Sequence, residues 1–400
     1  MERHLPIDAQ ADHAELIKTI GAAGTVLLKN THGTLPFKKP RFLCVFGYDA
    51  TIHPAPWANR DRYGGGYDVN FNWTTFNGTL ITGGGSGGNT PPYVVSPFQA
   101  IQERVAKDRG VLRWDFWSED PTRYVNAEAC LVFINAYASE TFDRASLRDD
   151  FSDNLVMNVA SIRLVDPWIS HPNVTAVLFA GLPGQESGHS LTSILYGDIT
   201  PSGRLPYTIA RSESDYGPLL NPVESSDRFP EDNLTEGVFV DYRHFDKHGI
   251  EPRFEFGFGL SYTTFNYAGM AAEIVAGADL AEYPDKNIQI IQGGHPSLWE
   301  IVAVVKCIVT NTGELGGAEI AQLYVGIPGE DTPVRQLRGF VKVGPLVPGQ
   351  ERQVVFELTR RDLSVWDVVA GQWRLQRGEY QVWVGASSRD LRLKSLLVVE

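Results

Sequence analysis

Short apolar runs and helix-like patterns alternate over the first two hundred residues. A short continuous apolar run is typical of a strand covered on both faces, whereas apolar residues at every third or fourth position indicate one face of a helix. Helices are predicted around the apolar positions of 16–20, 98–105, 155–162 and 191–195. The predicted strands are 25–28, 42–46, 111–116, 130–134 and 174–180. This alternation predicts an α/β fold with a mostly parallel sheet and helices on both faces.

Two of the predicted helices carry start signals. Pro97 suits a first helical turn, and Asp150 or Ser152 can cap the helix that follows the fourth strand. The regular pattern then fades between residues 201 and 260, where glycine, proline, aspartate and aromatic residues dominate. We expect long ordered loops there, packed by their aromatic side chains.

The last hundred residues change to a two-residue alternation. It begins at 299–307, and further short strands are predicted at 320–325, 340–343, 354–358 and 380–384. Short strands separated by turn signals at this spacing predict a β-sandwich. Residues 271–297 are weakly patterned and are interpreted as a linker or an insertion. The tryptophans of this part are most simply sandwich aromatics, and nothing in the pattern supports a carbohydrate-binding face; they are Trp299, Trp366, Trp373 and Trp383.

Composition and charge exclude several classes of protein. Of the 400 residues, 43% are hydrophobic and 21% are charged, which predicts a folded core rather than disorder. The net charge of −13 makes nucleic-acid binding a poor hypothesis. No apolar run is long enough for a transmembrane helix, so no membrane partner is expected. The three cysteines are far apart and form no CxxC motif, which excludes a disulfide-rich scaffold.

One loop combines acids and aromatic residues directly after the fourth predicted strand. Tyr137, Glu140, Phe142, Asp143 and Arg144 lie there, where open α/β sheets bind ligands. Hydrolysis of a sugar linkage needs a carboxylic acid that protonates the leaving oxygen, and aromatic rings suit sugar faces. Glu140 is the better candidate, because Asp143 can pair with its neighbour Arg144. The alternative is an ordinary solvated acid on a loop.

Three further motifs favour ordinary structural roles. Gly83–Gly88 satisfies GxGxxG, but prolines follow it instead of a helix, so a mobile loop is favoured over a dinucleotide site. Gly184–His189 does not fit G-x-S-x-G and is interpreted as a helical N-terminal turn, with Glu186 near the helix dipole. His244 and His248 lie four apart without an HExxH motif, so they are interpreted as surface histidines and no metal site is predicted.

Several motifs resemble glycoside hydrolase family 3 enzymes. Those that resemble the second, α/β sandwich domain of the family are Gly21–Asn30 with Leu35-Pro36, Ala180–His189, Leu195–Asp198, Pro201–Pro206, Tyr242-Arg243 with Phe245-Asp246, and Phe254–Tyr262. Those that resemble the fibronectin type III-like domain of fungal β-glucosidases are Val304–Gly316, Gln336–Phe340 and Arg361–Trp366. The motifs occur in the family's order and cover nearly the whole chain.

The resemblance implies a fold, an activity and a catalytic residue. It implies an α/β sandwich domain over 1–260, a fibronectin type III-like β-sandwich over 261–400, and a retaining β-glucosidase that removes terminal glucose from cellobiose or other β-glucosides. In this family a barrel supplies the nucleophilic aspartate, and a loop of the sandwich domain supplies the general acid/base glutamate. Glu140 matches that glutamate. Tyr137 and Phe142 are expected, from position alone, to line the aglycone side. No cofactor is expected.

The chain also departs from the family pattern. Sandwich-domain sequence begins near the first residue, and no Ser-Asp-Trp stretch of the kind that carries the nucleophile occurs. An eight-stranded barrel needs about 250 residues. We therefore expect the C-terminal portion of an enzyme, with the barrel as packing partner and without activity by itself. The alternative is a catalytically silent fragment that binds carbohydrate or a protein partner. A third hypothesis, a nucleotide-dependent enzyme, is supported by the glycine-rich run Gly83–Gly88 alone.

Localisation follows from the same resemblance. The full-length enzyme is expected to be a secreted glycoprotein of cellulose degradation, although the chain begins at Met1 without a signal peptide. Four N-x-[ST] sequons give this expectation weak support, at Asn72, Asn77, Asn173 and Asn233. The sequence leaves open whether the enzyme prefers glucosides or xylosides.

Overall fold

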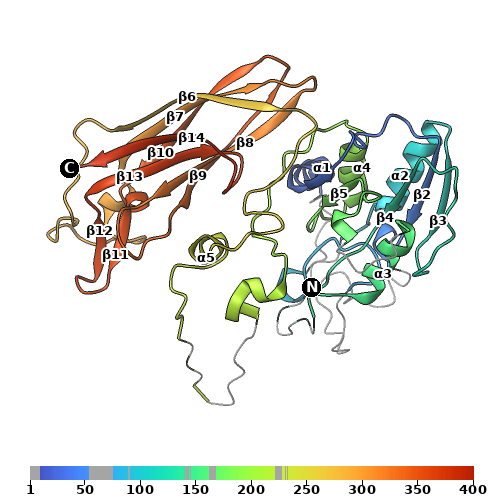
Figure 1. Cartoon of the computed structure of the whole chain (residues 1–400), viewed down its shortest axis with the longest axis horizontal. Helices are drawn as coiled ribbons and strands as arrows, with labels where there is room; N and C mark the ends of the chain where they lie inside the picture. The colour runs from blue at the N-terminus through green and yellow to red at the C-terminus, as the bar shows by residue number, and fades with distance from the viewer. Residues whose placement is uncertain are drawn as a thin grey trace, which may run out of the picture. The chain divides into compact units, whose positions relative to one another are not determined.

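The computed structural model in Figure 1 describes residues 10–53, 75–88, 91–138, 140, 144, 146–161, 168–220, 228–229, 231 and 233–400. The chain divides into two compact units, Met1–Gly203 and Arg204–Glu400. We call them the α/β unit and the sandwich unit. The domain boundary that we placed at residue 260 follows sequence motifs rather than spatial contacts, and it stays a prediction.

A parallel sheet of three strands forms the centre of the α/β unit. Its order is β3-β2-β4, with β2 (Phe42–Phe46) between β3 (Val111–Asp115) and β4 (Ala129–Val132). These are three of the predicted strands. Because the strands are parallel, the loops that follow β2 and β4 leave the sheet at the same edge.

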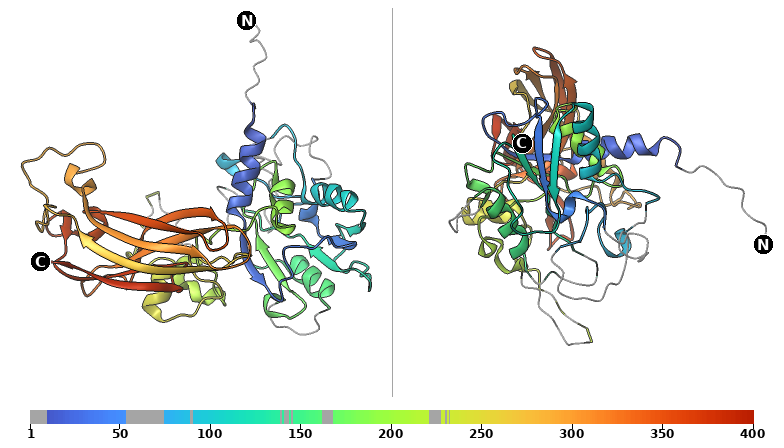
Figure 2. Two further views of the ribbon diagram at one scale, coloured as in Figure 1. Left: turned by 90° about the horizontal axis from the view of Figure 1, so that it is seen from above. Right: turned by 90° about the vertical axis from the view of Figure 1, so that its right-hand side faces the viewer.

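Four α-helices lie in the described part of this unit. They are α1 (His13–Gly24), α2 (Pro97–Lys107), α3 (Asp150–Val159) and α4 (Ser187–Leu195). Leu155 of α3 packs on the sheet face that carries Cys44 and Phe46. Figure 2 shows α1 beside α4, and the two helices are in contact.

Helix starts agree with the predicted signals to within one residue. Pro97 is the first residue of α2, and the side chain of Ser96 caps that helix by accepting a hydrogen bond from the amide of Gln99. The cap of α3 is Asp149, which accepts from the amide of Ser152, and not Asp150 or Ser152 as the sequence suggested. Asp149 has the extended backbone that a capping residue needs, whereas Asp150 is already helical.

Two predicted strands pair with each other instead of joining the parallel sheet. β1 (Val26–Asn30) and β5 (Ala176–Phe179) form an antiparallel pair with an irregularity between Leu27 and Lys29. The fold class, an α/β sandwich followed by a β-sandwich, is the one predicted. The direction in which a buried strand pairs is not encoded in its apolar run.

Two antiparallel sheets and a small hairpin form the β-sandwich. One sheet has the order β10-β7-β6 and the other β14-β13-β8-β9, and β11 pairs with β12. The strands are β6 (Phe265–Ile274), β7 (Ile301–Asn311), β8 (Gly317–Gly326), β9 (Gln336–Leu346), β10 (Glu351–Thr359), β11 (Ser364–Asp367), β12 (Gln372–Leu375), β13 (Gly378–Gly385) and β14 (Leu391–Val399). All five predicted strands are present. Strand β6 occupies the first positions of 271–297, and that segment's role as linker or insertion stays a prediction.

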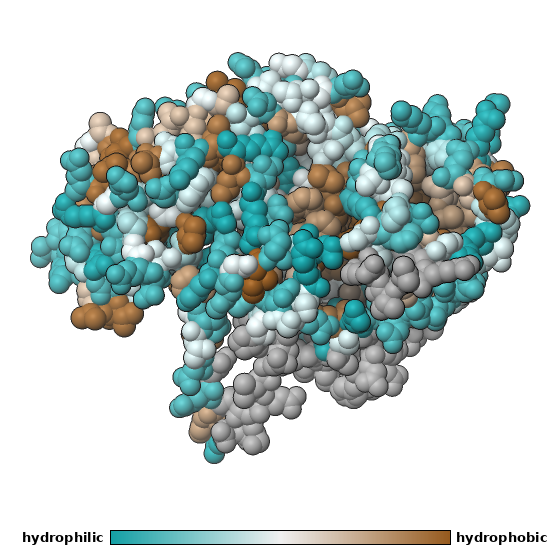
Figure 3. Space-filling view, viewed as in Figure 1, coloured by the Kyte–Doolittle hydropathy of each residue, from teal (hydrophilic) through white to brown (hydrophobic). Residues whose placement is uncertain are grey.

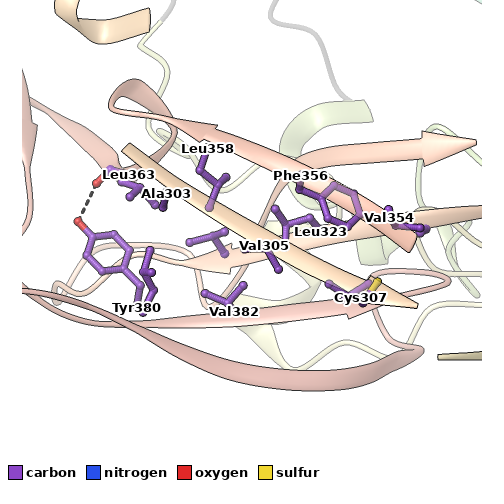
Figure 4. Close-up of a cluster of buried hydrophobic side chains, with 14 of the residues drawn as sticks. Ala303, Val305, Cys307, Leu323, Val354, Phe356, Leu358, Leu363, Tyr380 and Val382 are labelled. Carbon is purple, nitrogen blue, oxygen red and sulfur yellow. Dashed lines mark hydrogen bonds between the residues drawn. The ribbon is translucent and has the colours of Figure 1, made fainter. Parts of the chain in front are cut away.

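The sandwich has one continuous core, part of which Figure 4 shows. Alternate residues of β10 point inward, so that Val354, Phe356 and Leu358 are buried while Val355 is 42% exposed. The hydroxyl of Tyr380 donates a hydrogen bond of 2.8 Å to the carbonyl of Leu363, which satisfies the polar end of a fully buried ring. On the face of the sandwich drawn in Figure 3, hydrophobic residues form small separate groups among hydrophilic ones.

The segment before β6 packs on the sandwich through aromatic rings and polar contacts. Helix α5 (Tyr242–His248) places Asp246 where two guanidinium nitrogens of Arg335, Nη2 and Nε, reach it at 2.7 and 2.8 Å. Gly257 has a φ of +80°, and a Cβ there would overlap the buried side chain of Gln322. Gly257 therefore permits close approach of the backbone to β8.

Short 3₁₀ helices complete the described elements. They are Tyr48–Ala50, Gly85–Gly87, Trp168–Ser170, Glu213–Leu220, Pro296–Trp299 and Arg361–Leu363. No helix in the described ranges is both long and apolar enough to cross a membrane.

Candidate active-site loop of the alpha/beta unit

The loops that follow β2 and β4 are joined by hydrogen bonds at the edge of the parallel sheet. Asn135, three residues beyond β4, donates through Nδ2 to Oδ1 of Asp49 at 2.9 Å. Tyr48 donates from its hydroxyl group to the carbonyl of Asn135 at 3.2 Å, and its oxygen lies 2.7 Å from Oγ of Ser152. These bonds fix the start of the loop that carries Glu140.

The same asparagine fixes a third segment. Oδ1 of Asn135 accepts from the amide of Phe76 at 2.8 Å, and Nδ2 also donates to the carbonyl of Gly78 at 3.0 Å. Asp49 accepts from the amide of Leu80 at 2.8 Å. The backbone of 76–80 is therefore held by two side chains that come from two different strand ends.

Asp49 has a strongly shifted ionisation. Burial raises its pKa to about 7, although the hydrogen bonds from Asn135 and from the amide of Leu80 act in the opposite direction. Burial disfavours the charged form of a carboxyl group, and the two donors compensate for only part of that cost. Asp49 thus keeps its proton in mildly acidic solution.

Glu140 is exposed and touches the glycine-rich segment 83–88. The amide of Ser86 donates to Oε2 of Glu140 at 2.7 Å, and the hydroxyl of Ser86 donates to the same oxygen. The amide of Gly84 donates to the carbonyl of Ala138 at 3.3 Å. The glycine-rich segment and Glu140 are separate motifs in the sequence, and the structure brings them together.

Gly85 makes this contact possible. Its φ is +73°, and a Cβ at this position would overlap Cβ of Glu140 and lie 2.8 Å from Oε2. Only glycine fits both the backbone conformation and the space. The residue that this backbone approaches closely is the candidate catalytic residue Glu140.

The hydrogen bonds from Ser86 also act on the charge of Glu140. The hydroxyl group makes the larger contribution and the amide the smaller, and together they hold the pKa of Glu140 below its usual value. Donors that point at a carboxylate stabilise its ionised form. In this arrangement Glu140 is a carboxylate at neutral pH.

Of the two aromatic candidates on this loop, the structure describes only Tyr137. The ring of Tyr137 is partly buried and lies 6.1 Å from that of Phe76, in a small cluster that also contains Ile81. Phe142 lies outside the described residues, as does Asp143. Arg144 donates to the carbonyl of Leu147 at 3.3 Å. That Tyr137 and Phe142 line the aglycone side stays a prediction.

A buried carboxylate binds two side chains near the start of α4. Glu186 is 5% exposed; its Oε1 accepts from the hydroxyl of Tyr93 at 2.6 Å, and its Oε2 lies 2.7 Å from Nδ1 of His189. We expected Glu186 at the start of a helix, and it occupies the N-cap position of α4, but its side chain makes no capping bond. Ser187 donates to the carbonyl of Val95, so no Ser-His-Glu triad forms.

The turn before α4 anchors both ends of the glycine-rich segment. The amide of Gly184 donates to the carbonyl of Ile81 at 3.0 Å, and the amide of Val95 donates to the carbonyl of Gln185 at 2.8 Å. Ile81 and Val95 are thus both bound to one turn, and Ser86 lies between them in the sequence. The turn before α4 therefore supports the backbone on both sides of Ser86.

The histidines and tryptophans singled out in the sequence contact neighbouring groups of the sandwich unit. His244 and His248 lie with ring centroids 4.5 Å apart, and His244 faces the carbonyl of Asp215. In the described part of the chain, no three metal-ligating side chains come together. Trp366 and Trp373 form an edge-to-face pair with centroids 5.7 Å apart.

Two family descriptions match the chain. Residues 25–262 match the glycosyl hydrolase family 3 C-terminal domain, and residues 319–388 match a fibronectin type III-like domain. Probable beta-glucosidase M of Aspergillus oryzae is 48% identical over 410 residues, which cover 97% of this chain and 51% of that protein. A beta-glucosidase of Pyricularia oryzae is 45% identical, with 98% of this chain and 53% of that protein covered. The chain spans about half the length of these curated relatives.

Solved structures of similar proteins agree with these matches. The crystal structure of beta-glucosidase D2-BGL from Chaetomella raphigera has a TM-score of 0.84 and 37% identity, and the match covers 99% of this chain and 56% of that one. A beta-D-glucoside glucohydrolase from Trichoderma reesei has a TM-score of 0.85 and 33% identity over 99% of this chain and 57% of that one.

Proposed function

Since this chain belongs to glycoside hydrolase family 3, we propose that it forms part of a retaining β-glucosidase that removes terminal glucose from cellobiose and other β-glucosides. The relatives named beta-glucosidase support the substrate class. The observation that carries the proposal is the placement of Glu140. It is an exposed carboxylate beyond the carboxyl end of a parallel strand, on a loop whose first residues are fixed by Asn135.

Glu140 acts first as an acid and then as a base. Its protonated form gives a proton to the glycosidic oxygen while the bond from that oxygen to the anomeric carbon breaks. A second carboxylate forms a bond to the anomeric carbon from the opposite side. Ionised Glu140 then takes a proton from a water molecule, whose oxygen displaces the second carboxylate.

The second carboxylate comes from outside these 400 residues. Retaining hydrolysis needs two carboxyl groups about 5 Å apart, one on each side of the scissile bond. We assign the second to a barrel domain, in the half of the relatives that this chain does not cover. The 400-residue chain alone then cannot form the covalent intermediate. For the isolated chain, the alternative to the β-glucosidase function is therefore a catalytically silent role in carbohydrate binding.

The test uses a reconstituted enzyme, which we define as this chain joined behind the half of the Aspergillus oryzae relative that it does not cover. Glu140→Gln is expected to lower kcat/KM for cellobiose by about 10²- to 10⁴-fold. Hydrolysis of dinitrophenyl β-glucoside is expected to change less, because that leaving group departs without a proton. Glu119→Gln, an exposed acid of the same unit, is the matched control.

Chemical rescue makes the test specific for acid/base catalysis. In Glu140→Ala, azide is expected to restore turnover of the activated substrate and to yield β-glucosyl azide, because azide needs no base to attack the glycosyl-enzyme. Equal cellobiose activity in Glu140→Gln and in the unaltered reconstituted enzyme would refute the role of Glu140. Turnover by the 400-residue chain alone would refute the assignment of the nucleophile to another domain.

We also propose that the enzyme is secreted and glycosylated. Asn77, Asn173 and Asn233 are exposed sequon residues, whereas Asn72 lies outside the described ones. Nδ2 of Asn173 donates to the carbonyl of Ala160, so Asn77 and Asn233 are the better acceptors. Expression in a fungal host should give a mass that falls on treatment with an N-glycosidase. An unchanged mass contradicts the proposal.

A further inference from the structure

We propose that Ser86 is a positioning residue for Glu140: it fixes Oε2 through two hydrogen bonds and leaves Oε1 to face the leaving group. The inference rests on the proposed acid/base role of Glu140 and adds to it which oxygen reacts and what holds the other. It gives the glycine-rich segment a task in the reaction, which its sequence pattern did not reveal.

The geometry of the contact distinguishes the two oxygens of the carboxylate. Both donors of Ser86, the amide at 2.7 Å and the hydroxyl, point at Oε2. Among the described residues, none donates a hydrogen bond to Oε1. Two bonds from one residue to one oxygen also restrict rotation of the carboxylate about its last torsion. A proton on Oε1 then leaves in a defined direction.

The contact is built into the backbone on both sides. Gly85 has no side chain that would push Glu140 away, and the amide of Gly84 holds the carbonyl of Ala138 two residues before Glu140. The turn before α4 ties Ile81 and Val95 at the two ends of the segment. Ser86 therefore stands on an anchored backbone, which is what a positioning residue requires.

Ser86 also favours one of the two protonation states that the reaction needs. The groups that shift the pKa of Glu140 in the described structure are the hydroxyl and the amide of Ser86, which lower it, and slight burial, which raises it; no charged side chain is among them. Arg144 is the nearest described cation in sequence, and it is engaged with the carbonyl of Leu147. Ser86 thus supports the ionised, basic form, while cover by substrate and barrel would favour the protonated, acidic form.

A purely structural role of Ser86 makes a different prediction. If Ser86 only stabilised its own segment, any variant that loosens the segment would act in the same way. Thr82 offers the matched control, because its hydroxyl group donates to the carbonyl of Gly87 at 3.1 Å, within the segment and away from Glu140. Thr82→Val removes a hydroxyl group from the same backbone stretch without touching the carboxylate.

The first experiment measures the ionisation of Glu140 directly, in the 400-residue chain. Carboxyl-¹³C glutamate is incorporated, the Glu140 signal is assigned by its absence in Glu140→Gln, and pH titrations are recorded. Ser86→Ala is expected to raise the pKa of Glu140, because the hydroxyl donor is lost and only the amide remains. Ser86→Thr, which keeps both donors, is expected to titrate like the unaltered chain, and so is Thr82→Val.

Two outcomes of this titration overturn the inference. One is an unchanged pKa in Ser86→Ala, and the other is an equal rise in Thr82→Val. Neither depends on activity, so the inference can fail while the proposed function stands. If Ser86→Ala loses its fold by circular dichroism, Ser86→Cys replaces it, because a thiol of similar size is a much weaker donor.

The second experiment follows the pH profile of the reconstituted enzyme. The alkaline limb of kcat/KM for cellobiose reports loss of the proton from the acid, so Ser86→Ala is expected to move this limb to higher pH. It should also lower kcat for cellobiose about tenfold, with a smaller change for dinitrophenyl β-glucoside, since one hydrogen bond to a charged group is lost. A pKa rise in the titration without movement of the limb would overturn the acid/base role of Glu140 and this inference with it.

Discussion

The core of the sandwich unit and the candidate active-site loop of the α/β unit are held in different ways. In the sandwich unit one hydrophobic cluster takes residues from both sheets, and its strands alternate between core and solvent. Around the candidate active-site loop of the α/β unit, polar side chains such as Asp49, Asn135 and Glu186 bind backbone groups or one another. The sandwich is held by packing, and the candidate active-site loop is held by directed polar contacts.

This difference separates stability from activity. When buried apolar side chains are truncated, the free energy of unfolding falls in proportion to the volume removed, whereas changes on the solvent face cost little. A loop held by hydrogen bonds gains little net stability from each bond, but its geometry depends on every one. We therefore expect sandwich substitutions to change the free energy of unfolding and loop substitutions to change catalysis. Four predictions test this separation.

The largest expected effect lies in the sandwich core. Phe356→Ala removes a ring that is 4% exposed and should lower the free energy of unfolding by about 3–5 kcal/mol, through lost burial and the cavity left behind. Val355→Ala, one position away on the solvent face, should cost well under half of that. Urea unfolding measures both. A loss of kcat per folded molecule of the reconstituted enzyme in Phe356→Ala would break the separation of stability from activity.

The second effect lies in the glycine-rich segment. Gly85→Ala places a methyl group against Glu140, and the carboxylate must move; kcat/KM for cellobiose should fall about 10²-fold in the reconstituted enzyme. The melting temperature should change far less than in Phe356→Ala. Gly87→Ala is the matched control, because a Cβ there meets no atom within 4 Å. Equal losses in both variants would mean that the segment matters only as flexible backbone.

The third effect depends on pH. The unfolded chain releases the proton of Asp49 near its ordinary pKa, whereas the folded chain keeps it up to a pKa of about 7. The contribution of Asp49 to stability is therefore highest in acid and is lost as the pH rises from about 4 to 7, by at most about 1.4 kcal/mol per pH unit. Asp49→Asn, which does not ionise, should remove this part of the slope in urea unfolding between pH 5 and 8. Glu119→Gln should leave the slope as it is.

The sequence also predicted the two units to different extents. Alternation predicted strands β7, β8, β9, β10 and β13 of the sandwich and missed β6, β11, β12 and β14. It worked where a strand has one face in the common core, and neighbours in the chain are often neighbours in the sheet. In the α/β unit the apolar runs predicted the strands, but not that β1 and β5 pair with each other, since a run that is apolar on both faces carries no direction.

The candidate site shows the same limit. Glu140 was found from its place after a strand and from the family resemblance. Its partner Ser86 was not, because the two residues are 54 positions apart and no periodicity links them. Asp49 and Asn135 were also missed, although a signal exists: both follow parallel strands, and the carboxyl ends of parallel strands meet at one edge. Long-range hydrogen bonds between loops leave no pattern in one sequence.

The smallest expected effect is on an exposed ion pair of the α/β unit. Nη1 of Arg104 lies 2.7 Å from Oδ2 of Asp198, with the two side chains 23% and 53% exposed, and the guanidinium group also lies over the ring of Tyr196. Water screens the attraction, and the stacking on Tyr196 keeps Arg104 in place without the pair. Asp198→Asn should therefore cost at most about 1 kcal/mol in urea unfolding, and less in 1 M salt.

The control for this pair is Asp120→Asn, because Asp120 lies 3.9 Å from Arg123 and both side chains are more than two-fifths exposed. Asp120→Asn should lower the free energy of unfolding by less than Asp198→Asn does. A cost in Asp198→Asn that approached that of Phe356→Ala and persisted in salt would show that the α/β unit draws its stability from polar contacts. Polar contacts would then stabilise the α/β unit as packing stabilises the sandwich, and the proposed separation of stability from activity would fail.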